Sequence, residues 1–215
     1  MAISTYADLK SAVADWLNRD DLTSVIPTFV SLVEASVNRT LRVRDMLTRA
    51  DLTWAGSSGE VVPLPSDFLE LYSLEQTYPP DANVNPPLHY VGIDEMKRYK
   101  KTLPQSSGGQ TRYFTIFGNY LDLVPTPPDS LPLTLTYYAS VPALSTSEPT
   151  NWLLTKSPDI YLYGSLLHAA PYLKNDERAN VWGAGYQAAV ANLQADSERA
   201  MRPTTALIAR KRSFQ

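Results

Sequence analysis

The spacing of apolar residues predicts two amphipathic helices near the start of the chain. The first begins after Thr5, a favourable N-cap residue, and runs to about Asn18. The second begins near Pro27, because proline lacks an N–H group that the first helical turn does not need. The apolar faces of these helices are formed by Leu9, Val13, Trp16 and Leu17, and by Phe29, Leu32, Val33, Val37 and Leu41.

Polar residues of the second helix form a separate pattern. Glu34, Asn38 and Arg42 recur every four residues, so they are predicted to form a polar stripe opposite the apolar face, with Arg39 beside it. Such a stripe suits a solvated surface, a nucleic-acid contact or a subunit contact, and the pattern alone leaves all three open. Arg44 implies either that the helix has ended or that its side chain packs against a carboxylate.

From Thr48 onward the pattern changes to alternating and clustered β-forming residues, separated by turn residues. Gly118-Asn119 lies between two such runs, "RYFTIF" and "YLDLVP", and predicts a tight hairpin. A short helix is expected at "IDEMKRYKK". We therefore predict that residues 47–155 form a small antiparallel β-sandwich or barrel.

Helical periodicity returns at Ser157, a candidate N-cap followed by Pro158. The helix that follows is apolar nearly all round, which is typical of the centre of a bundle. The turn at Asn175-Asp176 precedes a last helix to about Ala200, in which close packing would explain two glycines. The predicted fold is α+β: an antiparallel helical bundle of residues 1–46 and 156–200, the β insertion of residues 47–155, and an extended basic tail of residues 201–215.

Composition adds a charge asymmetry to this picture. Residues 1–198 contain 14 Lys and Arg against 22 Asp and Glu, whereas residues 199–215 contain five basic residues and no acidic one. The absence of cysteine excludes disulfides, thiolate nucleophiles and cysteine zinc sites. No apolar run is long enough to cross a membrane, and the N-terminal residues do not resemble a secretory signal.

Candidate chemistry is sparse. His168 lies in an apolar helical stretch and His89 in a predicted strand, and neither has metal-ligand neighbours at suitable spacing. The pairs Asp94-Glu95 and Asp176-Glu177 lie at helix starts, where they favour the helix dipole. The glycine clusters do not match a phosphate-binding loop. We therefore expect no enzyme activity, no cofactor and no metal, and the acidic body makes sequence-specific DNA binding improbable.

Three stretches, in order, resemble the phage adaptor proteins, the head-to-tail connectors related to the tail tubular protein A of short-tailed bacteriophages. They are "IPTFVSLVEASVNRTLRVRDM", "LPSDFLELYSL" and "YLYGSLLHAAPYLKNDERANVWGAGYQAAVANL". The most specific parts are the Asn38-Arg39 and Leu41-Arg42 block and the segment from Ala169 to Leu173 with the "NDER" that follows it.

This resemblance implies a structural virion protein at the neck, assembled in the host cytoplasm. It implies a dodecameric ring that joins the portal to a tail nozzle or tail tube and surrounds a channel through which DNA passes. The polar stripe would then be a subunit interface, formed by Glu34, Asn38, Arg39 and Arg42. The C-terminal tail would dock on the portal through Leu207, Ile208, Arg210, Lys211, Arg212 and Phe214.

Alternatives remain for each part. The tail could be an unattached end or touch DNA. The β insertion could instead make the protein a receptor- or glycan-binding tail accessory, which a shallow cluster of exposed aromatics would favour; the candidates are Tyr78, Tyr90, Tyr99 and Tyr113. An enzyme would need a convergent polar pocket around His89 or His168.

Overall fold

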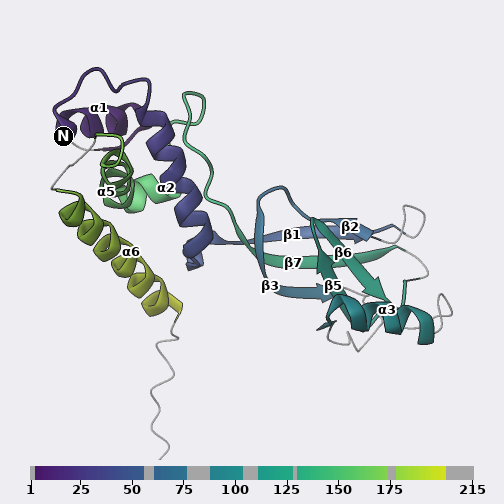
Figure 1. Cartoon of the computed structure of the whole chain (residues 1–215). Helices are drawn as coiled ribbons and strands as arrows, with labels where there is room; N and C mark the ends of the chain where they lie inside the picture. Colours follow the sequence, from purple (N-terminus) through teal and green to yellow (C-terminus); the bar gives the residue numbers. More distant parts are fainter. Residues whose placement is uncertain are drawn as a thin grey trace, which may run out of the picture. The chain divides into compact units, whose positions relative to one another are not determined.

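A computed structural model of the chain describes residues 3–55, 61–76, 88–103, 111–127, 130–173 and 178–201 (Figure 1). The chain divides into two compact units, one of residues 1–46 with 141–215 and one of Leu47–Ser140. The described residues contain six α-helices and two β-sheets, so the predicted α+β class is confirmed. No helix in these ranges is long and apolar enough to span a membrane.

The first unit is helical. Its elements are α1 (Tyr6–Leu17), α2 (Ile26–Thr40), the short 3-10 helix η1 (Arg44–Met46), α4 (Trp152–Lys156), α5 (Pro158–Ala169) and α6 (Ala179–Met201). The predicted limits of α1 are confirmed. The Thr5 hydroxyl accepts a hydrogen bond from the Asp8 N–H, and the Asp8 carboxylate accepts one from the Thr5 N–H. At the other end Asn18 is in the left-handed conformation that terminates helices.

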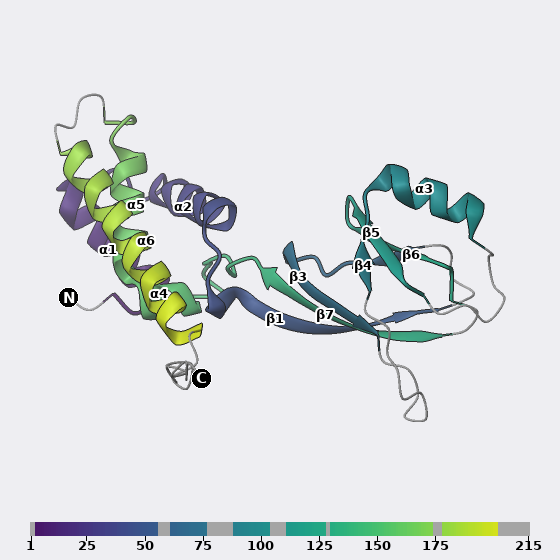
Figure 2. The same ribbon diagram turned by 90° about the horizontal axis from the view of Figure 1, so that it is seen from below.

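The apolar helix α5 is the centre of this unit, as predicted, because it contacts α1, α2, α4 and α6 (Figure 2). It ends at Ala169, since Pro171 cannot donate the hydrogen bond that a longer helix requires. The antiparallel bundle arrangement stays a prediction. The proposed turn at Asn175-Asp176 and the tail of residues 202–215 lie outside the described residues.

The boundary between the units differs from the expected one. The sequence places the end of the β insertion at 155, whereas the second unit ends at Ser140. Residues beyond Ser140 bind to the helices. The Tyr6 N–H, for example, donates a hydrogen bond to the Pro149 carbonyl at a distance of 2.7 Å. Helix α4, which was not predicted, also lies in this stretch and is capped by Asn151.

Two helices, α2 and α6, approach α5 closely at Gly164. A Cβ atom at this position would lie 2.8 Å from Cγ2 of Val33 on α2 and 3.2 Å from the Tyr186 ring on α6. Gly183 on α6 differs, because a Cβ there would meet Leu167 at 3.7 Å, an ordinary van der Waals distance. Glycine is thus required sterically at Gly164 and not at Gly183.

This difference gives a matched pair of substitutions. We expect Gly164→Ala to lower the free energy of unfolding by about 1–2 kcal/mol, because the steric cost in a packed core exceeds the gain in helix propensity. Gly183→Ala should raise it by up to about 1 kcal/mol, since the propensity gain meets no clash. Urea denaturation followed by circular dichroism measures both, and equal effects of the two substitutions would contradict the packing described.

The second unit contains two sheets. Its elements are β1 (Leu47–Trp54), β2 (Val61–Pro63), β3 (Phe68–Gln76), β4 (His89–Tyr90), α3 (Ile93–Thr102), β5 (Tyr113–Phe117), β6 (Tyr120–Val124) and β7 (Leu131–Ala139). The sheet orders are β1-β7-β3 and β2-β6-β5-β4. The pairs are antiparallel except β4 with β5, which is parallel. Because the strands form two separate sheets, the barrel alternative of the prediction is wrong. One apolar cluster contains residues of both sheets, and the sandwich alternative stays a prediction.

The β5–β6 hairpin positions the site described below. Gly118 has a φ of 57°, a left-handed conformation that glycine adopts at no steric cost, and the predicted Gly118-Asn119 turn is confirmed. Side chains alternate across the hairpin. Phe114 and Leu121 enter the core shared by the two sheets, whereas Thr115 and its cross-strand partner Asp122 belong to the opposite face. Helix α3 packs against both strands of this hairpin.

Candidate functional site

Glu34 and Asn38 do not form a solvent-exposed stripe, and that prediction is wrong. Glu34 is only 7% exposed, and its Oε1 accepts hydrogen bonds from the Leu144 N–H (2.8 Å) and the Tyr161 hydroxyl (3.2 Å). Asn38 Oδ1 accepts one from the Val141 N–H (2.9 Å). The stretch after β7 is irregular, so its backbone N–H groups need side-chain acceptors, and helical periodicity gives no indication of such a need.

The contacts of Glu34 extend into a buried polar network. Asn151 Nδ2 donates hydrogen bonds to the Tyr161 hydroxyl oxygen and to the Pro142 carbonyl, and both donor–acceptor distances are 2.7 Å. The Asn151 Oδ1 atom accepts from the Leu154 N–H and so caps α4. The network therefore joins α2, α4 and α5 to the stretch between Val141 and Asn151, and it fixes the path of the chain where it enters the helical unit.

Burial also changes the acidity of this network. Loss of water raises the pKa of the Glu34 carboxyl above its usual range, and its hydrogen bonds from Leu144 and Tyr161 oppose that rise only in part. Burial likewise raises the pKa of Tyr161. The folded protein therefore binds a proton at Glu34 more readily than the unfolded chain does.

This shift predicts a pH dependence of stability. A folded-state pKa raised above the unfolded value of about 4.3 favours folding below that value, and the contribution is lost as pH rises through the folded pKa. We expect the stability of the natural protein, relative to Glu34→Gln, to fall over the pH range that begins at about 4 and extends through the raised pKa of Glu34 in the folded state. Urea titrations of both proteins across this range measure the difference, and a rise with pH would contradict the prediction.

Arg42 and Arg39 differ in their surroundings. Arg42 is half-buried and its Nη1 donates to the carbonyls of Asn38 (2.9 Å) and Leu41 (2.6 Å), where it caps the C-terminal end of α2. Arg39 is exposed, and its Nε donates a hydrogen bond to the Ala35 carbonyl (3.1 Å). Burial, and to a lesser extent the charge of Arg39, lowers the pKa of the half-buried His168. Of the four predicted interface residues, Arg39 is thus the one with an exposed charge.

The remaining residues of interest fall into two groups. All six proposed docking residues of the tail lie outside the described residues. Among the tyrosines of the accessory-protein alternative, Tyr78 also lies outside, and Tyr90 is exposed. Tyr99 and Tyr113 are half-buried and stack on each other with ring centroids 4.6 Å apart. Within the described ranges, Tyr90, Tyr99 and Tyr113 therefore do not form a shallow exposed cluster.

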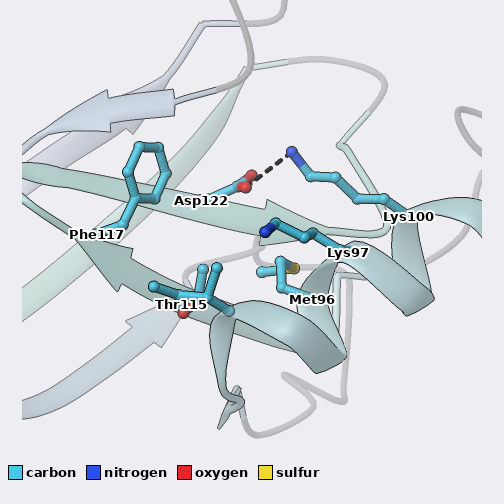
Figure 3. Close-up of a pocket in the computed structure, with 7 residues that line it drawn as sticks. Met96, Lys97, Lys100, Thr115, Phe117 and Asp122 are labelled. Atoms are coloured by element: carbon cyan, nitrogen blue, oxygen red, sulfur yellow. Dashed lines mark ion pairs between the residues drawn. The ribbon is translucent and has the colours of Figure 1, made fainter.

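A hollow of about 270 Å³ lies between α3 and the β5–β6 hairpin (Figure 3). Its apolar walls are Ile93, Met96 and Phe117, and its polar lining is Lys97, Lys100, Thr115 and Asp122. Neither histidine lines it. The hollow therefore combines an apolar interior with two cationic side chains supplied by one helix.

The polar groups of the hollow are unevenly satisfied. Lys100 Nζ lies 2.8 Å from Asp122 Oδ2, and the Asp122 side chain is 8% exposed. The other oxygen, Asp122 Oδ1, and the hydroxyl of Thr115 have no hydrogen-bond partner within the described ranges. Lys97 is largely exposed, and its Nζ lies 3.9 Å from a carboxylate oxygen of the almost fully exposed Asp94, a pairing that contributes little in water.

The sequence analysis did not identify this hollow. A signal was present, because strand alternation places Thr115 and Asp122 on the face away from the apolar core. The adjacent helix carries Met96 and Lys100 four residues apart, hence on one face. That this helix lies on this hairpin is a tertiary fact that neither pattern contains.

Exposed aromatics extend the surface of the second unit. Tyr72 is 61% exposed on β3, an edge strand, and packs edge-on against Tyr138 with ring centroids 6.2 Å apart. The pairing of β3 with β7 is irregular between Leu71 and Ser73, so Tyr72 lies at a bulge. Bulges re-aim side chains, and this one accompanies an unusually exposed tyrosine.

The described residues thus contain a buried network that fixes an irregular segment, an apolar hollow beside α3 and several exposed aromatics. The profile of the SU10 adaptor protein family matches residues 4–207, which is nearly the whole chain, and the protein belongs to this family. The resemblance to phage adaptor proteins is thereby confirmed, and a structural adaptor role in the phage virion follows from it. The relation to tail tubular protein A stays a prediction. No curated protein matches the sequence.

Proposed function

We propose that the protein is a head-to-tail adaptor that forms a dodecameric ring between the portal and the tail nozzle or tail tube of a phage. The ring surrounds the channel through which the genome passes, and it is assembled in the host cytoplasm into the neck of the virion. The observation that carries this proposal is the family match over residues 4–207. The acidic body adds support, because an acidic wall does not hold passing DNA.

A closed ring requires a heterologous interface, in which two different surface patches meet. We propose that the exposed end of α2 belongs to one of these patches. Arg39 supplies the charge at this surface, and Arg42 holds the helix end beside it. Glu34 and Asn38 support this patch indirectly. They accept hydrogen bonds from the backbone N–H groups of Leu144 and Val141 and so fix the stretch of chain beside α2.

Arg39→Glu tests this interface. We expect the melting temperature of the variant to change by no more than about a few degrees, because an exposed charge contributes little to stability. Ring formation on the portal should fall, because the substitution reverses the charge at the contact. Arg42→Glu is an unsuitable test, since it also removes a helix cap. Normal ring formation by Arg39→Glu would leave α2 as a solvated surface.

The proposal as a whole is tested by electron microscopy of the purified protein mixed with the portal protein of the same phage. We expect rings stacked on the portal, and mainly monomers when the portal is omitted, because a connector should assemble only on its template. Light scattering checks the second expectation. Absence of rings on the portal would overturn the proposed function, and a stable dodecamer in dilute solution without portal would overturn templated assembly.

A further inference from the structure

We propose that the hollow between α3 and the β5–β6 hairpin receives the side chain of Tyr72 from a second copy of this chain. This inference rests on the proposed ring, for which it supplies a specific contact between neighbouring subunits. Four observations carry it: the chemistry of the hollow, the exposure of Tyr72, the charges around both, and the place of both features on one unit.

The hollow suits a phenol. Ile93, Met96 and Phe117 offer apolar contact to an aromatic ring. At the polar lining, Asp122 Oδ1 and the Thr115 hydroxyl lack partners among the residues described, and both residues are more than nine-tenths buried. A tyrosine hydroxyl both donates and accepts hydrogen bonds, so its chemistry suits a lining that contains a carboxylate and a hydroxyl group. A purely apolar side chain would leave both groups unpaired at a cost.

Tyr72 is exposed and partly oriented by a neighbouring ring, so it is accessible to a partner molecule. It is 61% exposed at the β3 bulge, and the edge-on contact with Tyr138 holds one side of its ring. Tyrosine has few rotatable bonds and is enriched at the energetic centres of protein interfaces. An aromatic ring kept in water on an edge strand is otherwise unfavourable, because its apolar surface stays hydrated.

The surrounding charges are complementary. Glu75 is exposed three residues after Tyr72. Its cross-strand partner Thr134 accepts from Arg49 and donates to Asp51, which places all of these on the outer side of the sheet. Around the hollow, Lys97 and Lys101 of α3 are exposed. A tyrosine flanked by an acidic side chain therefore meets a hollow flanked by basic ones.

The occupant has to come from another molecule. The hollow and Tyr72 belong to the same compact unit, yet Tyr72 does not line the hollow and remains exposed. Two different patches on one chain that fit each other give the heterologous contact that a ring requires. DNA is a poorer occupant, since the apolar walls offer nothing to phosphates and Asp122 already neutralises the charge of Lys100.

Substitutions of Tyr72 provide the first test, with ring formation on the portal as the readout. We expect Tyr72→Ser to reduce ring formation by about tenfold or more, as truncation of an interface hot spot does. Tyr72→Phe should have a smaller effect, about threefold, because it removes only the hydrogen bonds of the hydroxyl. Tyr172→Ser is the matched control, since Tyr172 is 55% exposed on the helical unit and also packs edge-on against one ring, that of Phe29.

Charge reversal and cross-linking provide the second test. Glu75→Lys and Lys97→Glu should each weaken the ring, and the two together in one chain should restore it. The natural chain has no cysteine, so each single-cysteine variant can be cross-linked only at the introduced residue. A mixture of Glu75→Cys and Lys101→Cys copies, treated with a bismaleimide on the portal, should give cross-linked dimers. A mixture of Glu75→Cys with Glu148→Cys, at an exposed position of the helical unit, should give far fewer.

The outcomes separate this inference from the proposed function. Rings of Tyr72→Ser at the natural level, with no cross-link between Glu75→Cys and Lys101→Cys copies, would overturn the inference and leave the ring intact. Absence of rings for the unaltered protein would overturn both. Binding of a duplex DNA probe that is lost in Lys97→Glu, together with normal assembly of Tyr72→Ser, would overturn the inference and assign this surface to DNA.

Discussion

Glu34→Ala will lower the free energy of unfolding by about 2–4 kcal/mol, because it removes a buried acceptor and opens a cavity. The Leu144 N–H and the Tyr161 hydroxyl would lose their partner in a region that water does not reach. The irregular stretch after β7 depends on this acceptor, so the loss should spread from α2 to α4 and α5. Urea denaturation monitored by circular dichroism measures the change in unfolding free energy.

Two controls define the cause. Glu148→Ala removes an exposed glutamate from the same stretch of chain and should change stability by less than about 0.5 kcal/mol. Glu34→Gln keeps a carbonyl oxygen as acceptor but adds an amide donor, and its cost should be smaller than that of alanine. A cost for Glu34→Ala no larger than that of Glu148→Ala would show that the buried network does not hold the helical unit together.

Removal of the tail after Met201 will abolish stable attachment to DNA-filled heads. The truncation removes no described helix, because α6 ends at Met201, so the circular-dichroism spectrum should keep its helical signal. The lost segment contains basic residues and apolar residues together, a combination that suits docking along a partner. Ordering such a segment costs roughly 1–2 kcal/mol per residue, so repeated contacts around a ring would be needed to hold it.

Co-sedimentation of the truncated and full-length proteins with filled heads measures attachment, and DNA release from the heads gives an independent readout. Two full-length variants separate the contributions within the tail: one replaces Leu207, Ile208 and Phe214 by serine, and the other replaces Arg210, Lys211 and Arg212 by glutamine. Equal sedimentation of truncated and full-length protein would assign docking to the helical unit instead. The family match ends at residue 207, so this prediction rests largely on the tail sequence itself.

Local patterns in the sequence determined most of the elements. The Thr5 cap, the Pro27 start and the Gly118-Asn119 turn each depend on interactions within a few residues, and the structure has all three. The apolar circumference of α5 determined its central place, because a helix without a polar face has to be covered on every side. The family resemblance also came from the sequence, since it depends on the order of local patterns along the chain.

Tertiary structure decided which polar residues are surface and which are core. Glu34 and Arg39 are both polar residues of α2, yet one is buried and the other exposed, because the stretch that contains Val141 and Leu144 packs against α2 on a side that periodicity marks as polar. The hollow beside α3 likewise depends on which helix covers which hairpin face. Periodicity records only how a helix or strand divides its own side chains, whereas the burial of a polar group depends on a partner segment distant in the chain.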